Sequence, residues 1–530
     1  MSDLPLYARP EVHQRRWFLL GVLCLSLVMI VMAVSSLNVA LPTLQRDLGA
    51  SATMLQWIVD AYALVFAGLL LSAGAIGDRF GRKAALLGGL AVFGAGAIVS
   101  GFAGSAEVVI AGRAVQGIGA AFVMPATLSL ITVIFPPEER QRAIAIWVGF
   151  AGAGGALGPI VSGLLLEHFW WGSAFFANVP VVALTAVAVA LTAPRSRDDS
   201  ATPLDPRGAL LSLVGLASLL FAIIEGPERG WTDGLVLGAA AMAVVLLSVF
   251  VWWERRAEHP MLPLTFFADR RFTVGSSVVT IAFFVMFGFF FLFTQYLQFA
   301  RGYSPLDAGL AGLPFAATMI VVAPRSAAVA ARLGNGASMA FGFALVSLGM
   351  LVLALIGVST PYLVLVVAMV LLASGMGITT APATASIMSA VPMAKAGVGS
   401  AVNDTTRELG GALGIAVFGS IVSSVYRSGI DLDGLGLPAP AAQQAEESVG
   451  AATGVAAQLG GEGGAELAHR AATAFTDAFN VATGVSAAVV LAAGIVVART
   501  FGRRRFAGAP VLAHEGGGPL PVAEPAVAAD

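Results

Sequence analysis

Long apolar runs without charged residues recur along this 530-residue chain and limit what it can fold into. The first run covers residues 17–41, and no charged residue lies between Arg16 and Arg46. About 20 consecutive apolar residues are enough for an α-helix to cross a bilayer. We therefore expect an all-α membrane protein with 14 transmembrane helices. Their approximate ranges are 17–41, 54–76, 84–105, 107–133, 143–166, 173–193, 207–225, 234–253, 272–299, 306–324, 336–357, 361–390, 398–425 and 476–498.

The composition excludes several classes of protein. Hydrophobic residues make up 58% of the chain and charged residues 11%, whereas an ordinary globular domain carries about 25% charged residues. A net charge of −2 argues against a nucleic-acid partner, which would require a basic surface. The single cysteine, Cys24, allows neither an internal disulfide nor a cysteine-type zinc site. All five histidines lie outside the apolar runs, so we expect no metal and no cofactor.

The distribution of lysine and arginine predicts the orientation in the membrane. With the N-terminus inside, 22 of the 29 cations lie on the cytoplasmic side and five outside, as expected from the positive-inside rule. We therefore expect a multi-pass cell-membrane protein with its N-terminus (1–16) and C-terminal tail (499–530) in the cytoplasm. The Ala/Gly-rich segment 427–474 is expected to be a solvated extracellular loop without packed structure.

A charged motif, GAIGDRFGRK (74–83), follows the second apolar run. Its glycines permit a tight turn between two helix ends, and a plain cytoplasmic loop is one interpretation. The string closely resembles the G-x-L-a-D-R-x-G-R-K signature of the major facilitator superfamily, in which these residues latch the two halves of the protein together on the cytoplasmic side. By this resemblance, the latch residues are Gly74, Asp78, Arg79, Gly81, Arg82 and Lys83.

A buried arginine is predicted in the fourth run, where RAVQGIGAA occupies 113–121. An arginine at membrane depth costs at least about 2.5–3.5 kcal/mol, so Arg113 should face protein or a water-filled cavity. The string resembles the R-x-x-Q-G-x-G-A-A motif of the same superfamily, whose arginine is implicated in proton coupling. A purely structural arginine is the alternative.

The fifth run contains GGALGPIVSG at 154–163. Glycines four residues apart favour close helix packing, and a proline removes one helical hydrogen bond, so packing with a kink is one interpretation. The string also resembles the antiporter motif G-x-x-x-G-P-x-x-G-G, which separates exporters from importers in the superfamily. The matching residues are Gly154, Gly158, Pro159 and Gly163, and Ser162 stands where the motif has a glycine.

The number of apolar runs, fourteen, indicates a branch of this superfamily. The chain resembles the fourteen-helix drug:proton antiporter family. SSLNVALP (35–42), which contains Asn38, and NDTTRELGGALG (403–414) are similar to strings of that family. The resemblance implies a major facilitator fold of two six-helix bundles, at 17–193 and 272–498, with two extra helices in the linker 194–271. One departure is Ala33, where many members carry an aspartate.

Few titratable side chains lie inside the apolar runs. Asp60 has no oppositely charged neighbour within a helical turn, and burial disfavours the charged form of a carboxyl group. We expect Asp60 to carry the proton and Arg113 to modulate it, although Asp60 could instead cap the outer end of its helix.

Two further acidic sites are secondary candidates. In the thirteenth run, Asp404, Arg407 and Glu408 share one helix face. They could form an ion cluster whose charges neutralise one another, or they could take part in proton coupling. Glu225 lies at the outer end of the seventh run.

Exclusion of ATP-driven chemistry completes the expected function. The chain has two lysines, Lys83 and Lys395, and neither is followed by Ser or Thr. It therefore has no P-loop phosphate site. We expect proton-coupled efflux of small amphiphilic compounds and no enzymatic activity. The expected partners are protons, a lipophilic substrate and the lipid bilayer, and the protein is expected to be a monomer. A proton-coupled importer and a membrane receptor or scaffold without transport remain alternatives.

Overall fold

The computed structural model describes residues 6–197, 205–258, 260, 262, 264–391 and 396–501, and these residues form helices and connecting segments without strands. Thirteen helices in this part of the chain are long and apolar enough to cross a membrane. A further long helix, α5 (Pro137–His168), covers the predicted fifth run. The predicted all-α membrane fold is confirmed.

The N-terminal half contains the helices that precede residue 198, and its chain reversals follow local sequence signals. Ser51 caps the second helix by accepting a hydrogen bond from the Met54 amide, as serine commonly does at this position. Gly81, with φ of 124°, separates the second and third helices, a backbone conformation suited to glycine. The elements are η1 (Leu6–Ala8), α1 (Pro10–Leu48), α2 (Ala52–Phe80), α3 (Arg82–Gly101), α4 (Ala106–Ile134), α5, α6 (Ser173–Phe176) and α7 (Asn178–Thr192).

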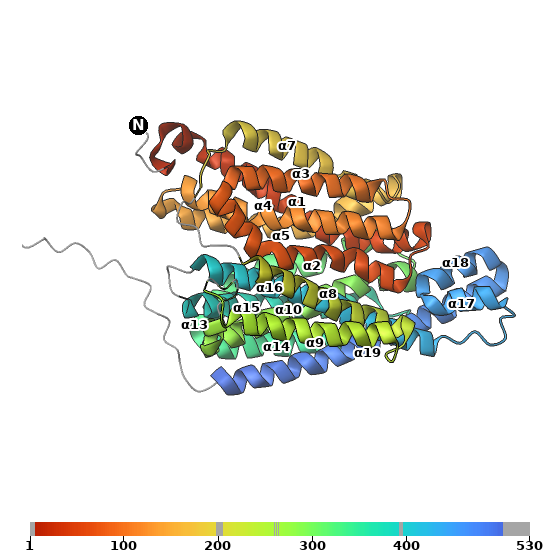
Figure 1. The fold of residues 1–530 in the computed structure, drawn as a ribbon. Helices are drawn as coiled ribbons and strands as arrows, with labels where there is room; N and C mark the ends of the chain where they lie inside the picture. Colours follow the sequence, from red (N-terminus) through yellow and green to blue (C-terminus); the bar gives the residue numbers. More distant parts are fainter. Residues whose placement is uncertain are drawn as a thin grey trace, which may run out of the picture.

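Two extra helices, α8 (Pro206–Arg229) and α9 (Gly234–Glu254), follow, and the C-terminal half then forms a second bundle beside the first (Figure 1). Asp205 and Asp233 cap α8 and α9 through their carboxylates. The C-terminal half comprises η2 (Leu264–Ala268), α10 (Arg270–Gln295), η3 (Tyr296–Ala300), α11 (Pro305–Ala311), α12 (Leu313–Val322), η4 (Ala323–Arg325), α13 (Ser326–Leu333), α14 (Asn335–Leu353), α15 (Tyr362–Ala390), α16 (Ala396–Gly429), α17 (Ala439–Glu447), α18 (Val449–Leu459) and α19 (Gly461–Phe501).

The short helices α17 and α18 form a hairpin at one end of the molecule (Figure 1). We call this end the hairpin end, and the opposite end, where α1 begins and α19 finishes, the terminus end. The prediction that 427–474 is solvated and without packed structure is wrong. Ala445, Val449 and Ala452 of the hairpin are buried, because a segment rich in alanine and glycine can pack closely without the large apolar residues that mark a core in sequence.

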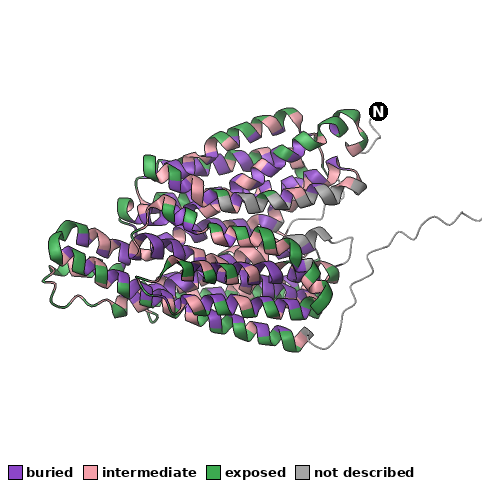
Figure 2. Ribbon diagram, turned by 180° about the vertical axis from the view of Figure 1, so that it is seen from behind, coloured by how far each residue is buried: buried purple, intermediate pink, exposed green. Residues whose placement is uncertain are grey.

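The hydrophobic core is shared between the two halves at the hairpin end. One continuous cluster joins C-terminal residues such as Phe289 and Phe475 to Leu41, Ile58 and Trp171 from the hairpin end of the N-terminal half. A second cluster holds the terminus end of the N-terminal half. Exposed residues lie along the outward faces of the bundle (Figure 2). Many large apolar residues are among the exposed ones, as expected for surfaces that meet lipid.

Glycines set how closely the helices of each bundle approach. A Cβ atom on Gly414 of α16 would collide with the Phe284 carbonyl of α10, and one on Gly119 of α4 would collide with the backbone of Phe93 on α3. Helices in membranes associate through such small residues, since lipid removes most of the hydrophobic driving force between helices. These contacts hold the bundles that carry the candidate site.

Gly414→Leu should destabilise the protein by about 1–3 kcal/mol, since the added side chain must displace the α10 backbone. Gly88→Leu is the matched control, because Gly88 is exposed and a Cβ atom there meets nothing within 4 Å. The measurement is the thermal unfolding midpoint in detergent. An equal midpoint for both variants would contradict this packing account.

Candidate functional site

Asp60 is a fully buried acid in the third turn of α2. Neither of its carboxylate oxygens has a hydrogen-bond partner within the described part of the chain. Ser51 caps this helix, so the alternative that Asp60 is the cap is wrong. An ionised carboxylate without a partner is very costly in an apolar interior, whereas its protonated form is far less so. The described surroundings of Asp60 therefore offer no partner for a carboxylate charge, and its role as the proton carrier stays a prediction.

Arg113 of α4 is also fully buried, and it contacts α2 on either side of Asp60. Its Nε donates to the Ile58 carbonyl oxygen at 3.1 Å, and Nη1 donates to Gln116 Oε1 at 3.1 Å. Its guanidinium lies 4.3 Å from the centre of the Tyr62 ring. The structure thus brings Arg113 to the Asp60 segment without a direct ion pair between them. Its hydrogen bond to Ile58 joins α4 to α2 at this point, and a part in proton coupling stays a prediction.

The three charged residues of α16 divide into a pair and a separate acid. Arg407 Nη1 lies 3.9 Å from Asp404 Oδ1, and its Nη2 donates to Thr384 Oγ1 at 3.4 Å. Glu408 has no hydrogen bond or ion pair among the described residues, and it lies within electrostatic reach of Tyr62 on α2. Asp404 and Arg407 are therefore an ion pair on one helix, and Glu408 is not part of it.

The charged motif at 74–83 binds within the N-terminal half in this structure. Asp78 Oδ1 accepts from Arg82 Nε at 2.7 Å and from Ser129 Oγ at 2.9 Å. Lys83 Nζ donates to the carbonyl oxygens of Ala190 and Ala193 at 2.7 and 2.9 Å. These bonds join α2, α3 and α4 to α7 and the segment that follows it, so a latch between the two halves stays a prediction.

The remaining motif positions have local contacts of their own. Arg79 lies over the neighbouring Phe80 ring, 5.7 Å from its centre. Gly74 faces Pro125 of α4. Asn38 is partly buried in α1, and Ala33, on the same helix, is buried in the core of the N-terminal half.

The glycines at 154–163 form two different close contacts of α5. Gly154 and Gly158 lie against α1, where Ser35 Oγ donates to the Gly154 carbonyl oxygen at 3.4 Å. Gly163 lies against the backbone of Leu306 on α11, in the opposite half. Gly309 of α11 in turn leaves room for the Pro159 carbonyl. This motif therefore governs contact between the halves as well as packing within one half.

The hydrogen bonds that join the two halves lie at the hairpin end, as far as the described side chains show. Gln298 Nε2 donates to the Val39 carbonyl oxygen at 2.9 Å. Ser304 Oγ, at the start of α11, donates to Glu167 Oε1 on α5 at 2.9 Å. Gln45 Nε2 of α1 donates to Ser448 Oγ at the start of α18 at 2.8 Å. The structure is thus closed at the hairpin end.

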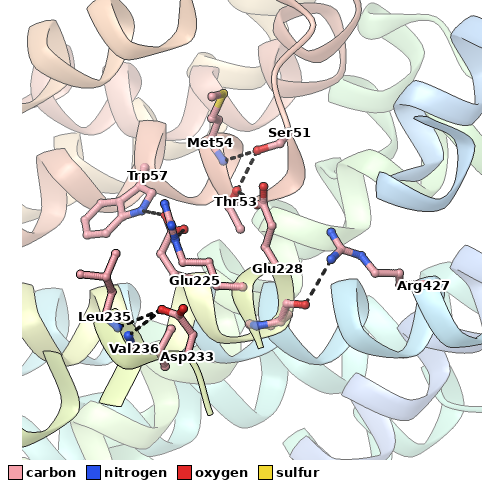
Figure 3. A network of polar contacts seen from close by, with 12 residues as sticks. Ser51, Thr53, Met54, Trp57, Glu225, Glu228, Asp233, Leu235, Val236 and Arg427 are labelled. Carbon is pink, nitrogen blue, oxygen red and sulfur yellow. Dashed lines mark hydrogen bonds and ion pairs between the residues drawn. The ribbon is translucent and has the colours of Figure 1, made fainter. Parts of the chain in front are cut away.

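Helix α8 is attached to the hairpin end of α2 (Figure 3). Glu225 Oε1 accepts from Trp57 Nε1 at 3.3 Å, and its Oε2 is paired with Arg229 Nε at 2.8 Å. Thr53 donates to the Glu228 carboxylate beside them. Glu225 is thus bonded to both Trp57 and Arg229. These bonds attach α8 to α2, whereas a proton carrier would be expected to lack such partners.

The same helix is bonded to α16. Ser420 Oγ donates to the Ile223 carbonyl oxygen at 2.6 Å. Arg427 Nη1 donates to the Pro227 carbonyl oxygen at 3.2 Å (Figure 3). Helix α8 therefore connects α2 of one half to α16 of the other. Sequence reasoning missed this connection, because backbone carbonyl acceptors leave no signal in side-chain patterns.

No group of three or more His, Cys, Asp or Glu side chains that could hold a metal ion occurs in the described residues. The candidate site is instead formed by the buried Asp60 of α2 and Arg113 of α4, together with the partly buried acids of α16 in the other half. Such a set can exchange protons and respond to the relative position of the halves.

Comparison with known proteins gives matches along nearly the whole chain. The sequence profile described as Major Facilitator Superfamily matches residues 23–415. The multidrug efflux pump LfrA of Mycolicibacterium smegmatis is 36% identical over 492 residues, which cover 92% of this chain and 97% of LfrA. The tetracenomycin C resistance and export protein of Streptomyces glaucescens is 34% identical over 412 residues, covering 77% of this chain and 76% of that protein.

Solved structures share the fold. A crystal structure of a bacterial homologue of the human lysosomal transporter Spinster superposes with a TM-score of 0.66 at 17% sequence identity. The superposition covers 95% of this chain and 100% of that chain. At this identity the likeness establishes the fold alone.

Arg113→Lys should lower stability by about 1.5–3 kcal/mol, because lysine keeps the charge but cannot make the same forked bonds to Ile58 and Gln116. Arg229→Lys is the control, since that exposed ion pair should contribute at most about 1 kcal/mol. Thermal unfolding in detergent measures both. A smaller loss for Arg113→Lys than for Arg229→Lys would contradict this account of the Arg113 contacts.

Proposed function

The chain belongs to the Major Facilitator Superfamily, and we propose that it exports small amphiphilic organic compounds across the cell membrane in exchange for protons. Export is supported by relatives that match most of the chain and are named as efflux or resistance proteins. The observation that carries proton coupling is Asp60, a buried acid within a span, with both oxygens unpartnered in the described residues.

In this proposal the proton gradient drives efflux, and Asp60 is the group that takes up and releases the proton. With the carboxyl group neutral, the site imposes little electrostatic cost, whereas an unpaired charge in the interior costs several kcal/mol. Each elementary charge that crosses a potential of 100 mV yields about 2.3 kcal/mol. A single proton per cycle would thus be enough to concentrate a substrate considerably on the far side.

The way in which the halves meet supports alternating access. The structure corresponds to a state in which the hairpin end is closed by the shared core and by the α5–α11 contact. We propose that the hairpin end faces outward and that both termini are cytoplasmic, in agreement with the positive-inside rule. Substrate would enter from the terminus side and leave when the halves separate at the hairpin end.

The motif at 74–83 would act in the opposite state. In the structure, Asp78 bonds to Arg82 and Ser129 of its own half. As the hairpin end opens, the terminus ends of the halves approach, and these charged groups could then exchange partners across the interface. Export rather than import is favoured by the relatives' names and by the resemblance of 154–163 to the antiporter motif.

Asp60→Asn should abolish proton-driven transport and leave substrate exchange without a gradient intact, because only the titratable group is lost. The measurement uses purified protein in proteoliposomes with a fluorescent lipophilic cation such as ethidium, with and without a pH gradient. Asp47→Asn makes the same chemical change at an exposed position and should transport normally. Undiminished gradient-driven transport by Asp60→Asn would exclude Asp60 as the proton carrier.

A further inference from the structure

A small cavity bordered by several polar side chains lies at the hairpin end between the two halves. Its volume is about 30 Å³. The lining includes Gln45 of α1, Gln56 of α2, Ser423 of α16, and Ser448, which precedes α18. These four side chains come from both halves and from the hairpin, and each is at least nine-tenths buried. Apolar residues such as Phe291 and Leu292 supply most of the cavity surface, so the hydrogen-bond partners of the buried polar side chains need to be identified.

Three polar atoms at this cavity lack partners in the described part of the chain. They are Gln45 Oε1, Gln56 Oε1 and Ser423 Oγ. Buried polar atoms are nearly always hydrogen-bonded, either to protein or to ordered water. A buried water needs two to four polar partners and a cavity of at least about 10–15 Å³. The cavity is large enough for water, and the three unpartnered atoms belong to side chains that line it.

Two glycines leave room for the amides that line the cavity. A Cβ atom on Gly419 of α16 would collide with the Gln56 amide, and one on Gly450 of α18 would collide with that of Gln45. The backbone of the C-terminal half thus lies directly against two polar side chains of the N-terminal half. This complementarity indicates a built site rather than a packing defect.

The cavity lies on the side of Asp60 toward the hairpin end. Gln56 and Asp60 are four residues apart on α2 and therefore occupy the same helix face. At the other side, the lining includes Glu447, an exposed acid at the end of α17. Polar groups thus extend from the surface at Glu447, past Gln45 and Ser448, to Gln56 and the buried acid.

We propose that this cavity binds water that conducts protons from the hairpin side to Asp60, and that Gln56 is the positioning residue that orients the water beside it. This inference rests on the proposed proton coupling. A hydronium ion at the mouth releases one proton and becomes water. Each water along the route accepts one proton and passes one on, and the Asp60 carboxylate becomes a neutral acid. The Gln56 amide keeps its own hydrogens throughout.

The charged and titratable groups around Asp60 leave it free to accept the proton that the water delivers. On α4, Arg113 is bonded to Ile58 and Gln116 and forms no ion pair with Asp60, whose two oxygens have no partner among the described residues. On α16, Tyr426 donates to the Ala445 carbonyl oxygen. The other titratable groups nearby are Tyr62 on α2, Glu408 on α16, Glu225 on α8 and Glu447 on α17.

Gln56→Leu tests the inference, because leucine has similar bulk but cannot bond to water. In proteoliposomes with ethidium as probe, gradient-driven transport should fall at least about tenfold, the change in rate expected from a barrier raised by about 1.4 kcal/mol. Exchange without a gradient should stay close to that of the unmodified protein. Gln444→Leu is the control and should transport normally, since it makes the same chemical change at an exposed position of α17 that does not line the cavity.

The variants distinguish this inference from the proposed function. Loss of gradient-driven transport in Asp60→Asn but not in Gln56→Leu would overturn the water route and leave proton coupling intact. Equal losses of exchange and of gradient-driven transport in Gln56→Leu would also overturn it, since a conduction defect spares exchange. Ser423→Ala removes one unpartnered oxygen without added bulk and should slow gradient-driven transport selectively, so the test remains decisive if Gln56→Leu does not fold.

Discussion

Close contact between the two halves at the hairpin end is the interaction on which the rest of the structure depends. Gly163 and Gly309 let α5 and α11 meet backbone to backbone, and side chains larger than hydrogen at these positions would hold the halves apart. The shared hydrophobic core and the bonds from α8 to α2 and α16 lie at the same end. Because membrane helices gain little from burying apolar groups away from lipid, such contacts can form and release at modest cost.

The buried charges are placed around this interface. Arg113 satisfies part of its hydrogen-bonding capacity with a carbonyl of α2 and with Gln116 of its own helix, which fixes the segment that carries Asp60. Asp60 itself is left without a partner among the described residues. A protein that needed the acid only for packing would gain stability from an apolar residue there, since an unpaired buried charge is costly. The arrangement therefore supports the proposed role of Asp60 in proton exchange.

Much of the fold could be predicted from the sequence because bilayer thickness fixes helix length, and the apolar runs give that length directly. The depth of Arg113 and the burial of Asp60 followed from the same runs. The hairpin of α17 and α18 could not be predicted, because Ala445, Val449 and their neighbours pack through small residues that resemble a linker in composition. The cavity at Gln56 and Gln45 was also missed, since it depends on Gly419 and Gly450 meeting those amides across an interface that sequence patterns do not show.

Separation of the halves at the hairpin end is the central claim, and cross-linking across that end tests it most directly. Glu167 on α5 and Ser304 at the start of α11 are exposed or partly exposed residues joined by a hydrogen bond between the halves. With Glu167→Cys and Ser304→Cys in a Cys24→Ser background, a short reducible bifunctional thiol reagent should bridge the halves. The account predicts that cross-linking stops ethidium efflux and that reduction restores it. Undiminished efflux by fully cross-linked protein would contradict it.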